Sequence, residues 1–248
     1  MSWLEGRIVE NRHWTEALFS LRVEGPALDF QAGQFVRIAL DIEEGNEGSR
    51  VARPFSFVNP PHDPVLEFYG VVVPEGPLSP RLARLKAGDV LHVASNPAGF
   101  LVLREVPDCE TLWLVATGTG IAPFLSILRT EAPWKRFRNV VLVHAARYGK
   151  ELVYRDTVSD LSKKTAFRYV SFVSRERHPG SLEGRIPAAI ADGRLEKAAG
   201  LALDAASSHV MLCGNPQMLT DAQAALAARG MRKHRRRNPG HITVESFW

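Results

Sequence analysis

Leu112-Trp-Leu-Val-Ala-Thr-Gly-Thr-Gly-Ile-Ala-Pro123 is the stretch that decides the fold of this chain. It opens as an unbroken apolar strand, and two glycines then lead into a predicted helix over about residues 121–129. Unbroken apolar strands occur where both faces of a sheet are covered. Glycines let the backbone approach a ligand closely, and a helix start presents free N–H groups to a phosphate. A tight turn needed only for packing explains the glycines equally well, and their spacing differs from the usual Gly-x-Gly-x-x-Gly pattern.

The same pattern of apolar strands and helices continues to the end of the chain. Further apolar strands are predicted at residues 140–145, 169–174 and 210–213, with helices over about 150–161 and from Gly214-Asn215-Pro216 to about 229. Apolar strands separated by helices predict a doubly wound parallel α/β sheet. Such sheets bind ligands at the carboxyl ends of their strands. Two glycine turns at the same edge therefore indicate a ligand site more strongly than either one does.

Up to about residue 105 the chain reads as β structure. Apolar and polar residues alternate at 19–23 and 36–41, and residues 66–73 form another strand-like run. Glycine and proline punctuate these runs, which predicts an antiparallel β-barrel or sandwich. One short helix interrupts, with Ser79 as its expected N-cap and Pro80 in its first turn. We therefore expect two domains, residues 1–105 and residues 106–248.

Composition bounds the remaining possibilities. The chain has 248 residues, 45% hydrophobic and 23% charged, with a net charge of +4. No run approaches the roughly 20 apolar residues of a membrane span, and the start lacks the layout of a signal peptide. Cys109 and Cys213 are too few for a disulfide framework or an iron–sulfur cluster. These features predict a cytoplasmic protein without a metal site. The modest positive charge permits an acidic partner without requiring nucleic acid.

A hydroxyl and two guanidiniums follow the third parallel strand. Ser174 and Arg175 end that strand, and Arg185 lies ten residues further on. In dinucleotide sites an acidic residue binds the ribose of NAD, whereas arginine accepts the 2′-phosphate of NADP. Solvated surface arginines are the alternative interpretation, and the carboxylate of Glu176 could instead face a ribose.

Two other segments carry chemistry. Arg53-Pro-Phe-Ser56 offers a cation, an aromatic face and a small hydrogen-bond donor, although it could be an ordinary strand with a surface arginine. The chain ends Phe247-Trp248, although termini are usually polar and frayed. A last strand packing into the core is one explanation. Stacking on a flat ligand is the other.

Together these segments resemble the bacterial ferredoxin/flavodoxin–NADP⁺ reductases over nearly the whole chain. The segments that carry the resemblance are Arg53–Ser56, Leu66–Tyr69, Gly76–Leu82, Ala116–Pro123, His144–Arg147, Val173–Glu176, Gly184–Pro187, Met211–Met218 and Phe247–Trp248. The resemblance implies that the β-barrel holds FAD and that the α/β domain holds NADPH. Many relatives have Tyr where this chain has Phe55 and Phe247, so a phenol hydrogen bond is absent at both positions.

The resemblance also implies residue roles. Those expected at FAD or in the nicotinamide channel are Arg53, Pro54, Phe55, Ser56, Phe68, Tyr69, Gly76, Leu78, Ser79, Thr119, Phe247 and Trp248. Those expected at NADP are Arg147, Ser174, Arg175, Arg185, Gly214, Asn215 and Met218. Ser56 and Cys213 are expected to position the reacting edges, and Glu245 to handle a proton or tune the flavin.

The implied reaction is hydride transfer between NADPH and FAD, followed by single-electron transfer to ferredoxin or flavodoxin. A basic cluster (Arg232, Lys233, Arg235, Arg236 and Arg237) is expected to dock that acidic carrier, or else to be a solvated turn. The alternative is an NAD(P)H–flavin reductase or a reductase of another acceptor. Nucleic-acid binding would explain the basic cluster but none of the other segments. We expect a monomer.

Overall fold

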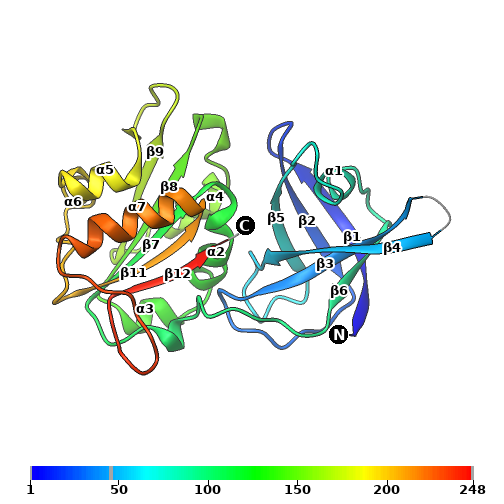
Figure 1. The fold of residues 1–248 in the computed structure, drawn as a ribbon, viewed down its shortest axis with the longest axis horizontal. Helices are drawn as coiled ribbons and strands as arrows, with labels where there is room; N and C mark the ends of the chain where they lie inside the picture. The colour runs from blue at the N-terminus through cyan, green and yellow to red at the C-terminus, as the bar shows by residue number, and fades with distance from the viewer. Residues whose placement is uncertain (1, 45–46, 247–248) are drawn as a thin grey trace.

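The N-terminal domain is an antiparallel barrel, shown in blue and cyan in Figure 1. The computed structural model describes residues 2–44 and 47–246, so Phe247 and Trp248 lie outside the described residues. The strands run in the order β4-β3-β6-β1-β2-β5. Their bounds are β1 Trp3–His13, β2 Leu18–Glu24, β3 Phe35–Glu44, β4 Glu47–Ser56, β5 Leu66–Val71 and β6 Val90–Ala94.

Alternating apolar residues build the barrel core. Leu21, Val23 and Ile38 are fully buried, as their alternation in the sequence predicts. A bridge between Phe57 and Phe68 brings the two edges of the sheet together just beyond β4. The short helix α1 (Ser79–Leu82) lies beside the barrel (Figure 1).

The C-terminal domain is a parallel sheet in the order β10-β9-β8-β7-β11-β12. Its strands are β7 Thr111–Thr117, β8 Asn139–Ala146, β9 Phe167–Val173, β10 Leu182–Glu183, β11 Ser208–Gly214 and β12 Ile242–Ser246. Its helices are α2 Ala122–Leu128, α3 Ala132–Arg136, α4 Arg155–Leu161, α5 Ile186–Ala191, α6 Arg194–Ala199 and α7 Pro216–Ala227. The 3-10 turns are η1 Leu103–Glu105, η2 Gly118–Ile121 and η3 Gly149–Glu151.

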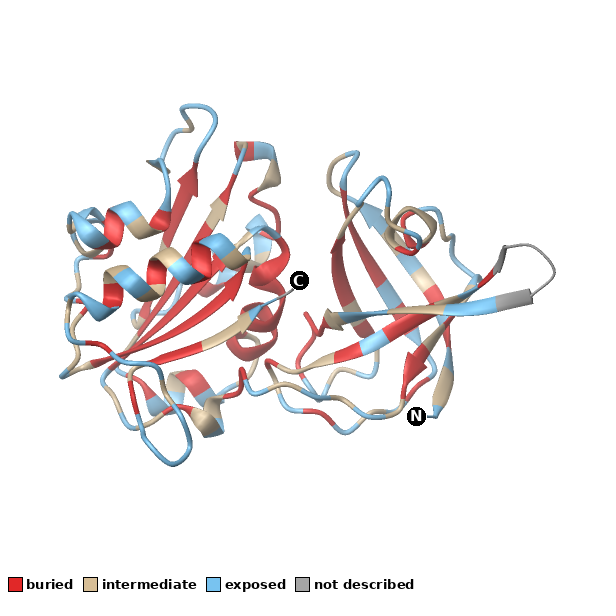
Figure 2. Cartoon of the chain, in the orientation of Figure 1, coloured by how far each residue is buried: buried red, intermediate tan, exposed pale blue. Residues whose placement is uncertain are grey.

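Strand β7 shows why this sheet is doubly wound. Leu112 and Leu114 belong to the core that includes α2, whereas Trp113 and Val115 belong to the opposite core with α5 and α7. Figure 2 shows the strands of this sheet mostly in red, the colour of buried residues. Both faces are covered by helices, so the predicted fold class is confirmed.

Two local predictions differ from the structure. Ser79 does not cap α1: Leu78 occupies the N-cap position without a side-chain cap, and the Ser79 hydroxyl accepts a hydrogen bond from Val73 N–H at 2.9 Å. Helix α4 begins later than expected because Tyr154 adopts a left-handed conformation, with φ of 60°. No helix within the described ranges is long and apolar enough to cross a membrane.

Candidate functional site

Two hydroxyls lie buried at the open edge of the barrel. Ser56 ends β4 and Tyr69 lies on β5, and the Phe57–Phe68 bridge brings them to neighbouring positions. Each residue is 3% exposed, yet neither hydroxyl has a hydrogen-bond partner among the described residues. Burial, with the nearby Glu151 carboxylate, raises the pKa of Tyr69 well above its usual value. Buried hydroxyls without partners cost free energy, so this edge is suited to a polar ligand.

The segment before Ser56 presents a cation and a ring. The Arg53 guanidinium is exposed and donates to the carbonyl of neighbouring Ala52 at 2.8 Å. Pro54 is exposed, and Phe55 is half-buried with its ring edge-on to Phe68 at 6.5 Å between centroids. Phe68 itself is 1% exposed and belongs to the barrel core. The structure therefore leaves Arg53 and Phe55 accessible, whereas Phe68 has a packing role.

The loop leading into α1 is tied down by backbone contacts. Gly76 N–H donates to Val73 O at 2.9 Å, which closes a tight turn. Leu78 is 2% exposed and anchors this turn in the barrel core. Ser79 is half-buried beside the turn. Of these three residues, Gly76 and Leu78 can offer only their backbones to a ligand, whereas Ser79 also has a hydroxyl.

The two glycine turns pack against each other. A Cβ on Gly120 would lie 2.5 Å from the carbonyl oxygen of Cys213, and a Cβ on Gly214 would lie 2.2 Å from the hydroxyl oxygen of Thr117. That hydroxyl accepts a hydrogen bond from Asn215 N–H at 2.9 Å. Gly118, in contrast, has φ of +53° and open space where its Cβ would be. Packing therefore requires Gly120 and Gly214, while Gly118 leaves the turn open for a ligand.

Thr119 and Met218 lie near these turns but are both largely buried, at 7% and 8% exposed. Met218 belongs to the hydrophobic core around α7. Asn215 is the N-cap of α7, and its side chain accepts hydrogen bonds from the backbone N–H groups of Gln217 and Met218. A packing role for Met218 and a capping role for Asn215 account for both residues.

A carboxyl and a thiol face each other on β12 and β11. Glu245 pairs with Cys213 in the strand register. Burial raises the pKa of Glu245 to about 7, against a smaller lowering by a hydrogen bond from the Phe100 backbone. Its Oε1 has no partner within the described part of the chain. Burial and Glu245 raise the pKa of the Cys213 thiol well above its usual value. Cys213 is thus a neutral thiol at physiological pH and Glu245 is poised to exchange a proton.

Glu245 also reaches the barrel side of the molecule. A Cβ on Gly99 would lie 3.0 Å from Glu245 Oε2. Gly99 belongs to the linker between β6 and β7 and has φ of +114°. The residue before it, Ala98, pairs with Phe35 of β3. Glu245 is therefore held where the two domains meet.

His144 is a buried residue whose role the sequence reasoning missed. Burial lowers its pKa to about 4, so the ring is neutral at physiological pH. Its Nε2 lies 3.1 Å from the carbonyl oxygen of Gly118 and donates to it, while Nδ1 has no partner among the residues described. His144 thereby supports the open glycine turn. A polar residue in an otherwise apolar strand is the signal that could have revealed it.

The carboxyl ends of β8 and β9 carry exposed arginines. Arg147 and Arg175 are joined by a backbone hydrogen bond of 3.0 Å, and Arg185 is the N-cap residue of α5. None of the three forms an ion pair within residues 2–44 and 47–246. Ser174 is exposed beside them and donates to Ala146 O at 3.3 Å. This edge concentrates unneutralised positive charge where parallel sheets bind ligands.

Glu176 forms no ion pair with Arg147, Arg175 or Arg185 among the described residues. Its Oε1 accepts a hydrogen bond from Gly149 N–H at 2.7 Å. The suggestion that its carboxylate faces a ribose is therefore less well supported than a role in holding the loop that begins at η3.

The basic cluster lies on the loop between α7 and β12. Arg236 forms a bidentate pair with Glu105, at 2.9 and 2.7 Å, and its guanidinium lies 4.8 Å from the ring centre of Phe100. Arg232 donates to Pro239 O. The other three members are exposed and form no ion pair among the described residues; they are Lys233, Arg235 and Arg237.

Comparisons with known proteins agree with this geometry. Residues 114–224 match the oxidoreductase NAD-binding domain family. The flavodoxin/ferredoxin–NADP reductases of Shigella flexneri and Escherichia coli (strain K12) are each 53% identical to this chain over 249 residues, covering 99% of both partners. A ferredoxin NADP⁺ reductase from Neisseria gonorrhoeae, solved with bound FAD and NADP, superimposes with a TM-score of 0.94 at 34% identity over the whole of both chains. The resemblance seen in the sequence is confirmed: the chain belongs to the flavodoxin/ferredoxin–NADP reductase family.

Proposed function

We propose that this protein transfers hydride between NADPH and FAD, and single electrons between FAD and ferredoxin or flavodoxin. The observation that carries the proposal is the set of buried oxygens without partners on Ser56, Tyr69 and Glu245. They lie on both sides of the junction between the barrel and the parallel sheet, close to the open turn at Gly118. The names of the relatives and the FAD and NADP of the Neisseria structure support the same conclusion.

The barrel residues fit a flavin. Ser56 and Tyr69 offer buried hydroxyls that lack partners in the described chain, Phe55 offers a half-buried ring, and Arg53 offers an exposed guanidinium for pyrophosphate. The backbone around Gly76, Leu78 and Ser79 completes this site. FAD, when bound, supplies the hydride and single-electron chemistry, and the protein supplies orientation and electrostatics. We therefore assign residues 1–105 to FAD and residues 106–248 to NADP(H).

The arginine edge fits the 2′-phosphate of NADP. Ser174, Arg175 and Arg185 offer a hydroxyl and two guanidiniums without carboxylate partners in the described chain, and Arg147 extends the edge. Charge-assisted hydrogen bonds to phosphate are about twice as strong as neutral ones. The edge should therefore favour NADPH over NADH.

We assign proton handling to Glu245. Because burial raises its pKa to about 7, its carboxyl can change protonation state near neutral pH. Its Oε1 faces no competing donor among the described residues, so it can give or take a proton at the domain junction. The neutral Cys213 thiol beside it is expected to line the nicotinamide channel.

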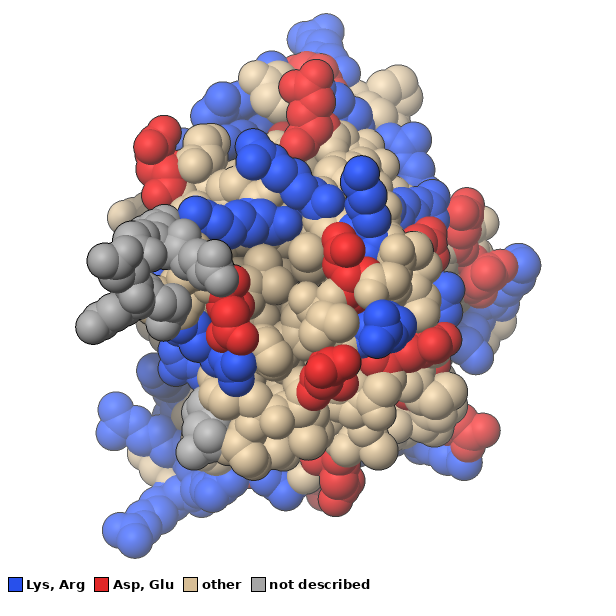
Figure 3. Space-filling view, turned by 90° about the vertical axis from the view of Figure 1, so that its right-hand side faces the viewer, with Lys and Arg blue, Asp and Glu red and all other residues tan. Residues whose placement is uncertain are grey.

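The carrier is proposed to dock on the basic loop. Lys233, Arg235 and Arg237 are exposed and unpaired in the described chain, whereas Arg236 already binds Glu105 and so contributes less net charge. The end of the barrel turned away from the parallel sheet mixes both signs of charge (Figure 3), which argues against docking there. Ferredoxin and flavodoxin are expected to meet the loop through acidic surfaces. We expect a cytoplasmic monomer.

Kinetics with purified protein tests the proposal. We expect a flavin absorption spectrum, faster reduction with NADPH than with NADH, and electron transfer to ferredoxin or flavodoxin. A colourless protein that does not bind FAD would overturn the cofactor assignment. Release of reduced flavin, with no transfer to either carrier, would identify a flavin reductase instead.

The terminal aromatics can be tested separately. Phe247 and Trp248 follow the described residues directly and are proposed to stack on FAD. A chain truncated after Ser246 should lose FAD more readily and change its rate of flavin reduction. Unchanged FAD retention together with an unchanged rate would rule out a stacking or gating role.

A further inference from the structure

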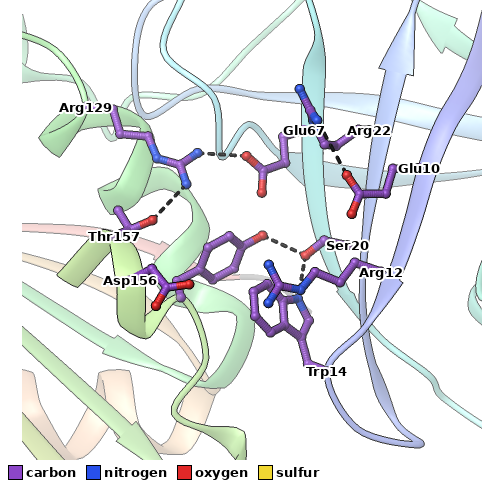
Figure 4. A pocket seen from close by; sticks show the side chains of 10 residues that line it. Glu10, Arg12, Trp14, Ser20, Arg22, Glu67, Arg129, Asp156 and Thr157 are labelled. Atoms are coloured by element: carbon purple, nitrogen blue, oxygen red, sulfur yellow. Dashed lines mark hydrogen bonds and ion pairs between the residues drawn. The ribbon is translucent and has the colours of Figure 1, made fainter. Parts of the chain in front are cut away.

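A group of buried and partly buried polar contacts joins the two domains on the side of β5. Arg129 and Tyr154 come from the parallel-sheet domain, while Ser20 and Glu67 come from the barrel. Figure 4 labels Arg129, Ser20 and Glu67. We call these four residues the interdomain clamp. They line a cavity of about 220 Å³. The clamp is distinct from the residues assigned above to FAD or NADP.

Arg129 makes the charged half of the clamp. It follows α2, and its Nη1 lies 2.7 Å from Glu67 Oε2 and 3.2 Å from the carbonyl oxygen of Val58. Its Nη2 donates to the hydroxyl of Thr157 on α4 at 3.2 Å. The two paired side chains are only 24% and 16% exposed. One guanidinium thus joins two barrel segments to α4.

Tyr154 makes the neutral half. Its hydroxyl lies 2.6 Å from Ser20 Oγ on β2, which also accepts a hydrogen bond from the indole N–H of Trp14 at 2.8 Å. Its ring packs against Trp14 at 4.9 Å and edge-on against Tyr69 at 5.5 Å, measured between centroids. Burial raises the pKa of Tyr154 well above its usual value, so the phenol stays protonated. Tyr154 therefore reaches across the junction as a neutral hydrogen-bonding group.

The backbone of Tyr154 is also unusual. It is the one non-glycine residue with positive φ in the described chain. Bulky residues adopt this conformation only where surrounding contacts hold them there. The contacts with Ser20, Trp14 and Tyr69 are the ones that can do so.

The clamp connects directly to the proposed cofactor sites. Helix α2 runs from the open turn at Gly118–Ile121 to Arg129, and all seven of its residues are buried. The loop that ends at Tyr154 begins at Arg147, on the arginine edge. On the barrel side, Tyr154 touches Tyr69, next to Ser56. The clamp is therefore joined, through the chain and through ring packing, to both sides of the site.

We propose that Arg129 and Tyr154 are positioning residues that fix the parallel-sheet domain on the barrel, and so set the alignment of the nicotinamide with the flavin. This inference rests on the proposed function. Reactivity falls steeply with misalignment, and a displacement of about 1 Å can cost about 100-fold in rate. No polar side-chain atom of the clamp bonds to a residue assigned to FAD or NADP in the described chain. A change at the clamp should therefore alter the alignment of the nicotinamide without altering its binding.

The main test is stopped-flow flavin reduction by NADPH in the FAD-loaded protein. Because Arg129→Met alone would strand the Glu67 carboxylate, the informative variant is the double change Glu67→Gln with Arg129→Met. Tyr154→Phe removes only the hydroxyl. We expect the limiting rate to fall about tenfold in the double variant and less in Tyr154→Phe, with the KM for NADPH changed less than about twofold. The long-wavelength absorbance of the stacked nicotinamide–flavin pair should weaken in parallel.

Arg22→Met is the matched control. Arg22 lines the same cavity, but its pair with Glu10 at 3.4 Å lies within the barrel. Arg22→Met should leave the limiting rate of flavin reduction unchanged. Arg129→Lys, which keeps the positive charge, should retain more of that rate than the double variant does. A double variant that melts earlier but reduces flavin at the wild-type rate would show a purely structural clamp and would overturn the proposal. Failure of the proposed function is distinguishable, because the wild-type protein itself would then show no NADPH-dependent flavin reduction.

Discussion

Polar groups are withdrawn from water at the junction between the domains, whereas they are exposed to water at the arginine edge of the parallel sheet. At the junction, Ser56 and Tyr69 are buried and Glu245 is half-buried, and each has a buried oxygen without a partner in the described chain. At the edge, Arg175 and Arg185 are charged, exposed and likewise without carboxylate partners. Water solvates the arginines at little cost, whereas the buried oxygens lack that compensation.

We expect this difference in burial to give the two regions different functions. Buried groups change their pKa and interact strongly with neighbouring charge, which suits proton handling and ring alignment. Exposed guanidiniums keep their charge and select for phosphate. Changes at the junction should therefore alter rate and pH dependence, while changes at the edge should alter cofactor choice. The following predictions test this division, from the largest expected effect to the smallest.

Glu245 should make the protein less stable as the pH rises from about 4.5 to about 7. Burial raises its pKa in the folded protein to about 7, above the ordinary value of 4.5 for a glutamate. Below pH 4.5 the carboxyl is protonated in both states. Between pH 4.5 and 7 the unfolded state ionises first, so folding stability falls by up to about 3 kcal/mol and is constant above that range. Urea unfolding across pH 4–8 should show this slope in the wild type and a flatter profile in Glu245→Gln. Parallel profiles would contradict the burial effect.

Arg175 and Arg185 should act on NADPH alone. Each change to alanine removes a charged hydrogen bond to the 2′-phosphate, so the KM for NADPH should rise about tenfold for each and about 100-fold together. The KM for NADH should stay the same. Arg168→Ala is the control, because Arg168 is exposed at the opposite end of β9. Equal losses with NADH and NADPH would show that the arginine edge does not select the 2′-phosphate.

Ser56→Ala should separate stability from function. Because the hydroxyl is buried without a partner, its removal should leave the FAD-free protein as stable or about 1 kcal/mol more stable. The rate of flavin reduction in the loaded protein should fall about tenfold. The matched change Ser171→Ala should instead destabilise the protein and leave the rate of flavin reduction unchanged. The Ser171 hydroxyl is buried and bonded to Ser181 at 2.8 Å. A destabilised FAD-free Ser56→Ala protein would point to a structural role.

The basic loop should give the smallest effect. Replacing Arg235 and Arg237 by alanine should slow reduction of ferredoxin or flavodoxin a few-fold at low salt and flatten its salt dependence. Reduction of a small neutral dye should be unaffected. Arg194→Ala is a suitable control, since Arg194 is already paired with Asp192. An unaltered salt dependence would place the carrier elsewhere.

Periodicity and short motifs were sufficient to predict the two domain types. Unbroken apolar strands such as 112–116 require covered faces, and alternating strands such as 19–23 require one open face. The same sequence signals placed Ser174 and Arg175 at the end of the third parallel strand. His144, Arg129 and Tyr154 were not recognised, because a histidine, arginine or tyrosine can be solvated or buried and only its neighbours decide which. The glycine turns were located from the sequence, but their packing on each other was not visible because they lie far apart along the chain.

The sequence by itself therefore determined the fold class, the order of the domains and the family, since all three depend on local patterning and on motifs read in order. The tertiary structure alone decided which polar groups lost their water. It paired Arg236 with Glu105 and Arg129 with Glu67, but left Ser56, Tyr69 and one oxygen of Glu245 buried without partners among the described residues. Desolvation depends on contacts between segments distant in sequence, and it is desolvation that raises the pKa of Glu245.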